Sequence, residues 1–73
     1  MQSEEEALEA IKRFVRTQVA LDGRVMALTF DPGHSWWVAE VVSLAHGRSR
    51  LLARQTDGVW EVWKFRGGIR SNT

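Results

Sequence analysis

The chain contains no cysteine, and this absence removes two common ways of stabilising a small domain. Without thiols there can be neither a disulfide framework nor a thiolate metal site. A domain as short as 73 residues buries only about 60% of the surface that its unfolded chain exposes. Association with a partner is the remaining common route to further burial. We therefore expect a homodimer or a complex with a protein partner.

Long apolar runs are also missing. No uninterrupted run approaches the roughly 18 residues that a membrane span needs. The segment Ser3–Glu6 is acidic, where a secretory signal would be basic and then apolar. We therefore expect a cytoplasmic protein without a membrane partner.

The chain also lacks a dense basic face. The apolar fraction of 44% and the charged fraction of 26% are typical of globular domains, and the formal net charge is only +1. Basic residues outnumber acidic ones from His46 to Thr73, by six to two. Such a strip is compatible with an anionic partner but falls short of the charge density of most nucleic-acid binders.

The first third of the chain has the pattern of an amphipathic helix. Ser3 and Glu6 have the spacing of a capping box, and glutamates suit the positive end of the helix dipole. Apolar residues then recur at helical spacing, at Leu8, Ile11, Val15 and Val19. Gly23 is expected just past the end of the helix. These signals predict one helix over residues 4–21.

After Gly23 the apolar period changes to two, which is typical of strands. Four strands are predicted, over residues 24–30, 36–44, 49–55 and 59–65. Each is bounded by a turn signal: Asp31-Pro32-Gly33, His46-Gly47 and Asp57-Gly58. The tail, residues 69–73, is expected to fray. The whole chain, 1–73, is thus interpreted as one α+β domain, an N-terminal helix packed on a four-stranded antiparallel meander. By topology alone this layout resembles those of the cystatin-like and PepSY-like folds.

The two short loops predict which residues face each other across the sheet, because a two-residue loop fixes the register. An Asp57-Gly58 loop pairs Thr56 with Val59 and Leu52 with Trp63. A His46-Gly47 loop pairs Val41 with Leu52. One face of the sheet, assigned to the helix, then collects Trp36, Val38, Glu40, Val42, Leu44, Leu51, Ala53, Trp60, Val62 and Lys64.

The opposite face is predicted to be uncovered and yet rich in apolar residues. Its predicted apolar anchors are Trp37, Val41, Leu52, Trp63 and Phe65, with Arg50 and Arg54 to orient a partner. Soluble monomers rarely expose apolar patches above a few hundred Å² without a use for them. Aromatic residues and arginine are also enriched at the centres of protein interfaces. We therefore expect a non-enzymatic module that self-associates or docks on a protein partner through this face.

Catalytic and metal chemistry find little support in the sequence. The two histidines, His34 and His46, fall in predicted turns and cannot supply the roughly four ligands of a structural zinc site. Asp31 could orient His34, but no nucleophile is identifiable beside the pair. We predict no catalytic residues, no metal and no cofactor.

Two other function classes remain open. Exposed rings beside arginines could stack the bases of a single-stranded nucleic acid, and such binding should weaken steeply as salt concentration rises. Alternatively, the helix and a curved sheet could enclose a small apolar ligand. A cavity large enough for one would remove much of the core of so short a chain.

Overall fold

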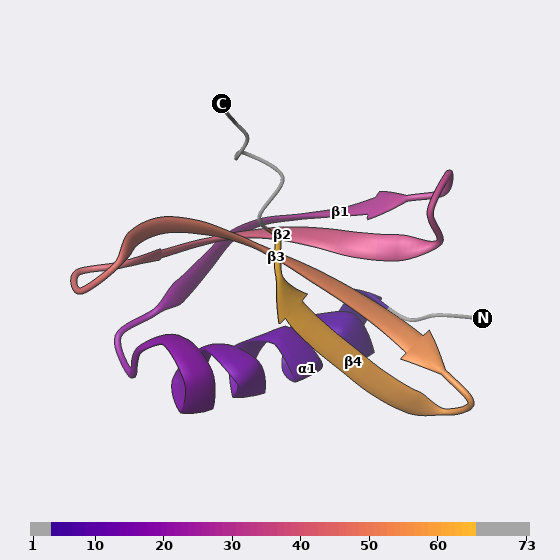
Figure 1. The fold of residues 1–73 in the computed structure, drawn as a ribbon, viewed down its shortest axis with the longest axis horizontal. Coiled ribbons are helices and arrows are strands. Elements are labelled where there is room, and N and C mark those ends of the chain that lie inside the picture. The colour runs from indigo at the N-terminus through magenta and orange to yellow at the C-terminus, as the bar shows by residue number, and fades with distance from the viewer. Residues whose placement is uncertain (1–3, 66–73) are drawn as a thin grey trace.

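The computed structural model describes residues 4–65, which form one N-terminal helical segment and a four-stranded antiparallel sheet (Figure 1). The helical segment consists of the α-helix α1, Glu4–Phe14, and a π-helix η1, Val15–Val19. The strands are β1, Arg24–Asp31; β2, Trp36–Ser43; β3, Gly47–Thr56; and β4, Val59–Lys64. They lie in the order β1-β2-β3-β4, so the sheet is a meander. The predicted α+β fold is confirmed, and the strand bounds agree with the predicted ones to within two residues.

The helix buries the apolar stripe that the sequence predicts. Ala7 and Ile11 are fully buried and Val15 is 1% exposed. The helical segment ends at Val19, two residues before the predicted end, and its last turn is wider than an α-helix because the Ala20 amide donates to the Val15 carbonyl oxygen. The Thr17 hydroxyl donates to the Arg13 carbonyl oxygen at 2.9 Å, a side-chain bond that competes with the helical ladder. The predicted capping residue Ser3 lies outside the described residues.

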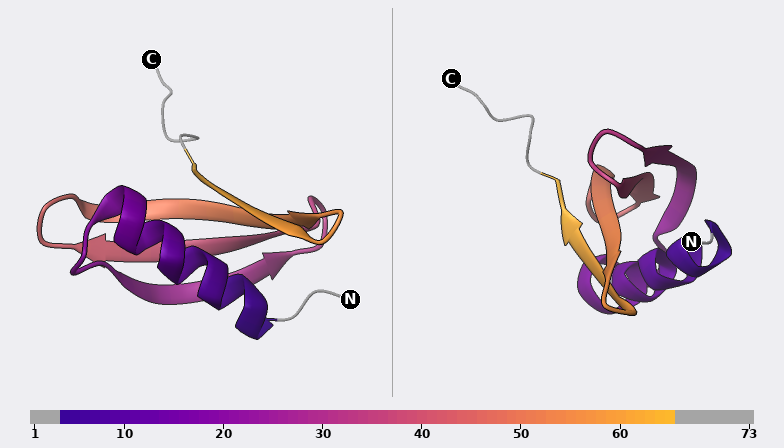
Figure 2. Two further views of the ribbon diagram at one scale, coloured as in Figure 1. Left: turned by 90° about the horizontal axis from the view of Figure 1, so that it is seen from below. Right: turned by 90° about the vertical axis from the view of Figure 1, so that its right-hand side faces the viewer.

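The helix crosses one face of the sheet on a diagonal (Figure 2), and we call this the inner face. The main core forms between the two layers, where helix side chains meet the middle of β2 and β3. Its buried members are Ile11, Val15, Ala39, Val41, Leu51 and Ala53. Partly buried residues surround it, namely Phe14, Val19, Val25, Leu28, Trp37, Trp60 and Val62. The side of the sheet away from the helix is the outer face.

The hairpin between β3 and β4 has the predicted register. Thr56 pairs with Val59, Arg54 with Glu61 and Leu52 with Trp63. Asp57 and Gly58 both have positive φ, at 53° and 80°, as a two-residue turn matched to the twist of a hairpin requires. The Asp57-Gly58 signal therefore predicts correctly both the position of the loop and the side of the sheet on which each side chain of these two strands lies.

The hairpin between β2 and β3 differs from its prediction. Ser43 pairs with Gly47, so the loop is Leu44 to His46, and Gly47 has a φ of 66° where the chain enters β3. Val41 consequently pairs with Ser49 rather than with Leu52. The shift between predicted and observed partners is three residues, an odd number, and an odd shift turns every side chain of one strand to the other face. The predicted faces are thus right for β3 and β4 and wrong for β2.

The first hairpin combines a bulge with a tight turn. The register between β1 and β2 shifts between Val25 and Ala27, which leaves Met26 as an extra residue that is 63% exposed. At the other end, the His34 amide donates to the Asp31 carbonyl oxygen across a turn with Pro32 at its second position. The turn signal predicted at Asp31-Pro32-Gly33 is therefore confirmed.

Candidate interaction surface

The outer face of the sheet has no helix over it among the described residues, and it carries both apolar and charged side chains. Cross-strand partners in an antiparallel sheet point to the same side, so the register assigns this face. Its charged members are Arg24, Asp31, Glu40, Arg48, Arg50, Arg54 and Glu61. Its larger apolar members are Trp36, Val38, Val42, Leu52, Val59 and Trp63.

A second, smaller apolar group lies in the middle of this face, and we call Trp36, Val38, Leu52 and Trp63 the outer cluster. Leu52 pairs with Val38 on one side and with Trp63 on the other. The rings of Trp36 and Trp63 meet edge to face, with centroids 5.9 Å apart. Leu52 is only 3% exposed although it points away from the helix. The outer face is therefore a packed layer, with rings at its surface.

Arginines lie over the rings at the margin of the outer cluster. The Arg54 guanidinium carbon is 5.7 Å from the centroid of the Trp63 ring, and that of Arg50 is 5.8 Å from the Phe65 ring. Arg50 also pairs with Glu40, at 3.4 Å between Nη2 and Oε2. About half of each side chain of this pair is exposed, so the pair stabilises the fold by about 1 kcal/mol at most. Both arginines are exposed.

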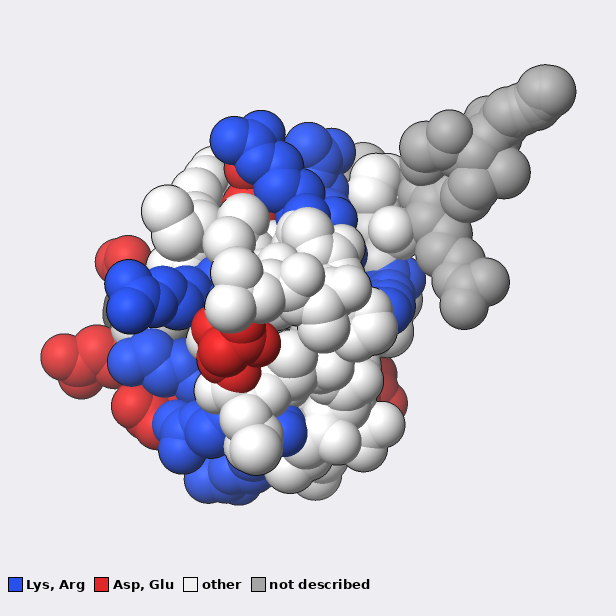
Figure 3. Space-filling model, turned by 90° about the vertical axis from the view of Figure 1, so that its left-hand side faces the viewer, with Lys and Arg blue, Asp and Glu red and all other residues white. Residues whose placement is uncertain are grey.

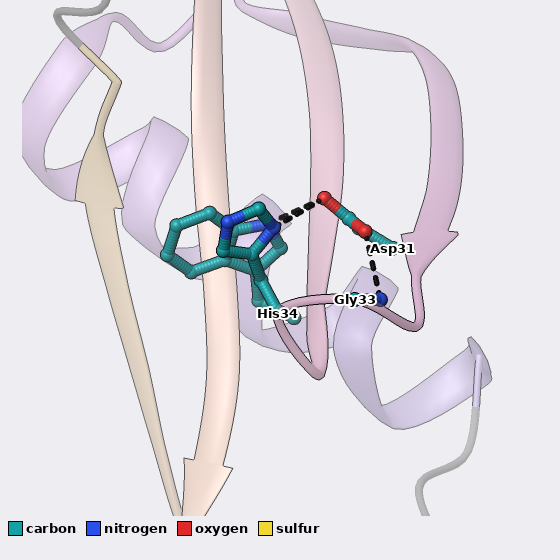
Figure 4. Close-up of polar contacts among 4 residues, drawn as sticks. Asp31, Gly33 and His34 are labelled. Carbon is teal, nitrogen blue, oxygen red and sulfur yellow. Dashed lines mark hydrogen bonds and ion pairs between the residues drawn. The ribbon is translucent and has the colours of Figure 1, made fainter.

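The turn before β2 holds the other edge of the outer cluster in place (Figure 4). Asp31 Oδ1 accepts the Gly33 amide at 3.0 Å, and Oδ2 lies 2.9 Å from His34 Nδ1 and 3.3 Å from Trp36 Nε1. The His34 ring stacks on the Trp36 ring, with centroids 4.5 Å apart. The hydrogen bond from His34, with those from Gly33 and Trp36, holds the pKa of the Asp31 carboxyl below its ordinary value of 3.8, although partial desolvation acts in the opposite direction.

The structure brings five of the seven predicted interface residues to the outer side: Arg50, Leu52, Arg54, Trp63 and Phe65. The placement of Trp37 and Val41 on this face is wrong. Val41 is 1% exposed in the main core, and Trp37 packs against that core with its ring 5.1 Å from Phe30. Both errors follow from the three-residue shift in the β2–β3 loop. Leu52 is an internal contact of the outer cluster rather than an accessible anchor.

Sequence reasoning placed Trp36, Val38 and Glu40 under the helix, and the structure places all three on the outer face. Glu40 was the available signal. It is the single charged residue of β2, it is exposed, and it pairs with Arg50. A charged residue in the middle of a strand belongs on the solvated face unless it is paired in the core, and this rule alone would have oriented β2 correctly.

Within residues 4–65, no group of three His, Cys, Asp or Glu side chains is placed to hold a metal ion. Nor does this part of the chain contain a helix with the length and apolar character needed to cross a membrane. No family model, no curated protein and no solved structure matches the chain.

Proposed function

We propose that this chain is a non-enzymatic protein-interaction module that acts through the outer face of its sheet. The observation that carries the proposal is the outer cluster with its rim, in which two tryptophans and Phe65 lie at the surface with Arg50 and Arg54 beside them. Phe65 is 40% exposed. Interfaces concentrate their binding energy in aromatic residues and arginines that pack together in this way.

The partner that best fits this face is a second copy of the chain. Acids and arginines stand in neighbouring strands, with Glu40 beside Arg50 and Glu61 opposite Arg54. In a two-fold interface each residue meets the same surface of the other copy, so a face of one charge sign would repel itself. A face that carries both signs can place acid against arginine around the apolar centre. The formal net charge of +1 adds little repulsion between copies.

Single-stranded nucleic acid is the second candidate, because the register adds Arg24 and Arg48 to Arg50 and Arg54 on the outer face. Base stacking needs open rings, however, and Arg54 already covers one side of Trp63. Seen from the end that carries the β2–β3 hairpin, Lys and Arg lie in separate groups with uncharged and acidic side chains between them (Figure 3). A divided basic surface suits a phosphate backbone less well than a continuous track.

The mass of the chain in solution tests the proposal. We expect sedimentation equilibrium to give a mass approaching twice 8.3 kDa as the concentration rises. Phe65→Ser should weaken this association about tenfold or more, as loss of an interface hot-spot residue does, because it removes an exposed ring at the end of β4. Trp63 is a poorer choice because it stands opposite Leu52 and its ring meets Trp36 in the outer cluster, so its loss would disturb folding.

Leu44→Ser is the matched control, since Leu44 is 96% exposed but lies in the β2–β3 loop, away from the outer cluster. It should leave the association constant unchanged. A monomer mass at every concentration would contradict self-association. Equal effects of the two variants would show that the outer face is not the contact. Steep loss of a single-stranded DNA complex with salt, in a chain that stays monomeric, would favour the second candidate.

A further inference from the structure

The free edge of β4 is a second surface with defined chemistry. β4 is the last strand of the sheet, and among residues 4–65 its one strand neighbour is β3. An edge strand presents backbone donors and acceptors that can pair with another extended chain. The opposite edge, β1, is interrupted by the bulge at Met26, and such a bulge disfavours pairing. The two edges are therefore not equivalent.

The register specifies which backbone groups of β4 point outward. The Phe65 amide donates to the Arg50 carbonyl oxygen, so it points toward β3. The direction of the backbone N–H and C=O groups alternates along an antiparallel strand, and therefore these groups of Glu61 and Trp63 also point toward β3. Trp60, Val62 and Lys64 direct their N–H and C=O groups to the open edge. The side chains of Trp60 and Val62 lie on the inner face, beside the helix.

A groove runs beside this edge, between β4 and the helix. Two hollows, of about 780 and 370 Å³, share Ala10, Arg13 and Trp60 in their linings and so lie next to each other. Phe14 and Val62 add apolar lining to the second hollow, which lies nearer the end of the helical segment. Both hollows are shallow and open to solvent, so they would contact the side chains of a bound peptide from one side. An extended peptide on the β4 edge would thus place every second side chain in the groove.

The charge of the groove selects among peptides. Its end near the β3–β4 turn is lined by Glu5, Glu6 and Glu9 against the single cation Arg13. Glu5 and Glu9 are exposed on the helix, at the surface where a peptide would leave the groove. A peptide antiparallel to β4 would run from Lys64 toward Gly58 and would end beside these acids. Its last inner-facing residues would then gain from a positive charge.

We propose that the β4 edge and the α1–β4 groove bind an extended peptide segment whose alternate residues are apolar and whose C-terminal residues are basic. The backbone pairs with Trp60 and Val62, the apolar side chains pack on Trp60, Val62 and Phe14, and the basic end faces Glu5 and Glu9. This surface lies on the helix side of the sheet and is distinct from the outer face. The two proposals can therefore fail separately.

The test uses the full chain and a fluorescein-labelled eight-residue peptide in which Thr alternates with Val and the last two apolar positions are Lys. A second probe carries Glu in place of Lys. Fluorescence anisotropy should show saturable binding of the first probe, and the second should bind about tenfold more weakly or worse, equivalent to about 1.4 kcal/mol. In ¹⁵N-labelled protein the largest amide shifts should fall at Trp60, Val62 and Lys64. Absence of binding at about 1 mM, the weak end of measurable affinity, would overturn the proposal.

Two variants locate the site. Val62→Pro removes an outward-pointing N–H without breaking a bond to β3, and it should abolish binding of the lysine probe. Glu5→Lys should weaken binding about fivefold, in line with a rim charge worth about 1 kcal/mol. This second variant still tests the site if the proline variant does not fold. Glu4→Lys is its matched control, with the same charge change in the same helical turn but outside the groove lining. Equal effects of Glu4→Lys and Glu5→Lys would contradict a local contact.

Other occupants of the edge give different results. Protection of the Val62 amide from hydrogen exchange before peptide is added would mean that another copy or another part of the chain already pairs there, and would overturn the proposal. Peptide-induced shifts centred on Trp36 and Trp63 would move the site to the outer face and would also overturn it. Phe65→Ser should bind the lysine probe as the unmodified chain does.

Discussion

Asp31 stabilises the turn before β2 and, through Trp36, holds one edge of the outer cluster. One carboxylate accepts hydrogen bonds from Gly33 and His34 in the turn and from Trp36, the first residue of β2. The Trp36 ring is held by this bond and stacks on His34, and it meets the Trp63 ring edge to face. The turn signal in the sequence is a Pro-Gly pair. The positioning of a tryptophan by the aspartate before that pair could not be predicted from turn propensity.

Asp31→Asn tests this role through the pH dependence of stability. Since the pKa of Asp31 is lower in the folded chain than its ordinary 3.8, the ionised carboxylate stabilises the fold fully above pH 3.8. That contribution is lost as the pH falls through the lowered pKa. The variant should therefore be less stable than the unmodified chain at pH 7, and the difference should shrink toward zero in acid.

Urea unfolding followed by tryptophan fluorescence at a series of pH values measures this difference. Asp57→Asn, which removes one negative charge from the β3–β4 turn, is the comparison for a general charge effect. A difference for Asp31→Asn that stays constant from pH 7 to below pH 3 would contradict a contribution from the ionised carboxylate.

Among the helices and strands, the helix and the β3–β4 hairpin could be predicted because the local sequence of each is compatible with one arrangement. The apolar stripe through Ile11 and Val15 has a single helical phase, and Asp57-Gly58 has the positive-φ residues of a single turn type. The β2–β3 hairpin carries no such signal. Gly47 alone has a positive φ, and the Ser43 hydroxyl accepts the His46 amide at 3.0 Å to close a longer loop.

The apolar pattern could not correct this error, because both faces of β2 are apolar. Trp36 and Trp37 are adjacent, and so are Val41 and Val42, so the alternation that normally distinguishes inside from outside is lost. The cause is physical: the outer cluster makes the outer face a second packed layer. A sheet that packs on both sides weakens the very pattern from which its register is inferred.

Gly23 controls how the helix joins the sheet. A Cβ on Gly23 would lie 2.3 Å from Val15 Cγ1 and 3.2 Å from the Ala20 carbonyl oxygen. Glycine is needed here because the backbone lies close to the helix, and not for a left-handed conformation, since its φ is not positive. The side chain that would have to move, Val15, is 1% exposed in the main core.

Gly23→Ala should destabilise the fold by about 1–3 kcal/mol, the usual cost of overpacking a filled core. Chemical denaturation measures it. Gly33→Ala is the matched control: its Cβ would meet only Asp31 Oδ1, at 3.4 Å, and its φ is not positive. That change should be neutral or stabilising by up to about 1 kcal/mol through the unfolded state. Equal losses in the two variants would contradict the steric account.

For the whole molecule, the central fact is that one helix covers one side of a sheet whose two sides are both apolar. The main core uses the inner face, and among residues 4–65 the outer cluster shelters Leu52 without a second layer above it. A chain of 73 residues has little stability to spare, so burial of the outer rings in a dimer would add to its folding free energy. Assembly and stability should therefore be linked.

This linkage predicts that the melting temperature depends on protein concentration. A partner that binds only the folded chain raises Tm by mass action, and for a dimer that dissociates as it unfolds the rise is up to about 3–6 °C for each tenfold increase in concentration. Thermal unfolding followed by circular dichroism over two decades of concentration measures the slope. Phe65→Ser should move this rise to concentrations about tenfold higher or more, in line with its weaker association. Gly23→Ala should lower Tm at every concentration but leave the dependence of Tm on concentration unchanged, because its clash lies in the main core. A concentration-independent Tm in the unmodified chain would refute self-association as a source of stability.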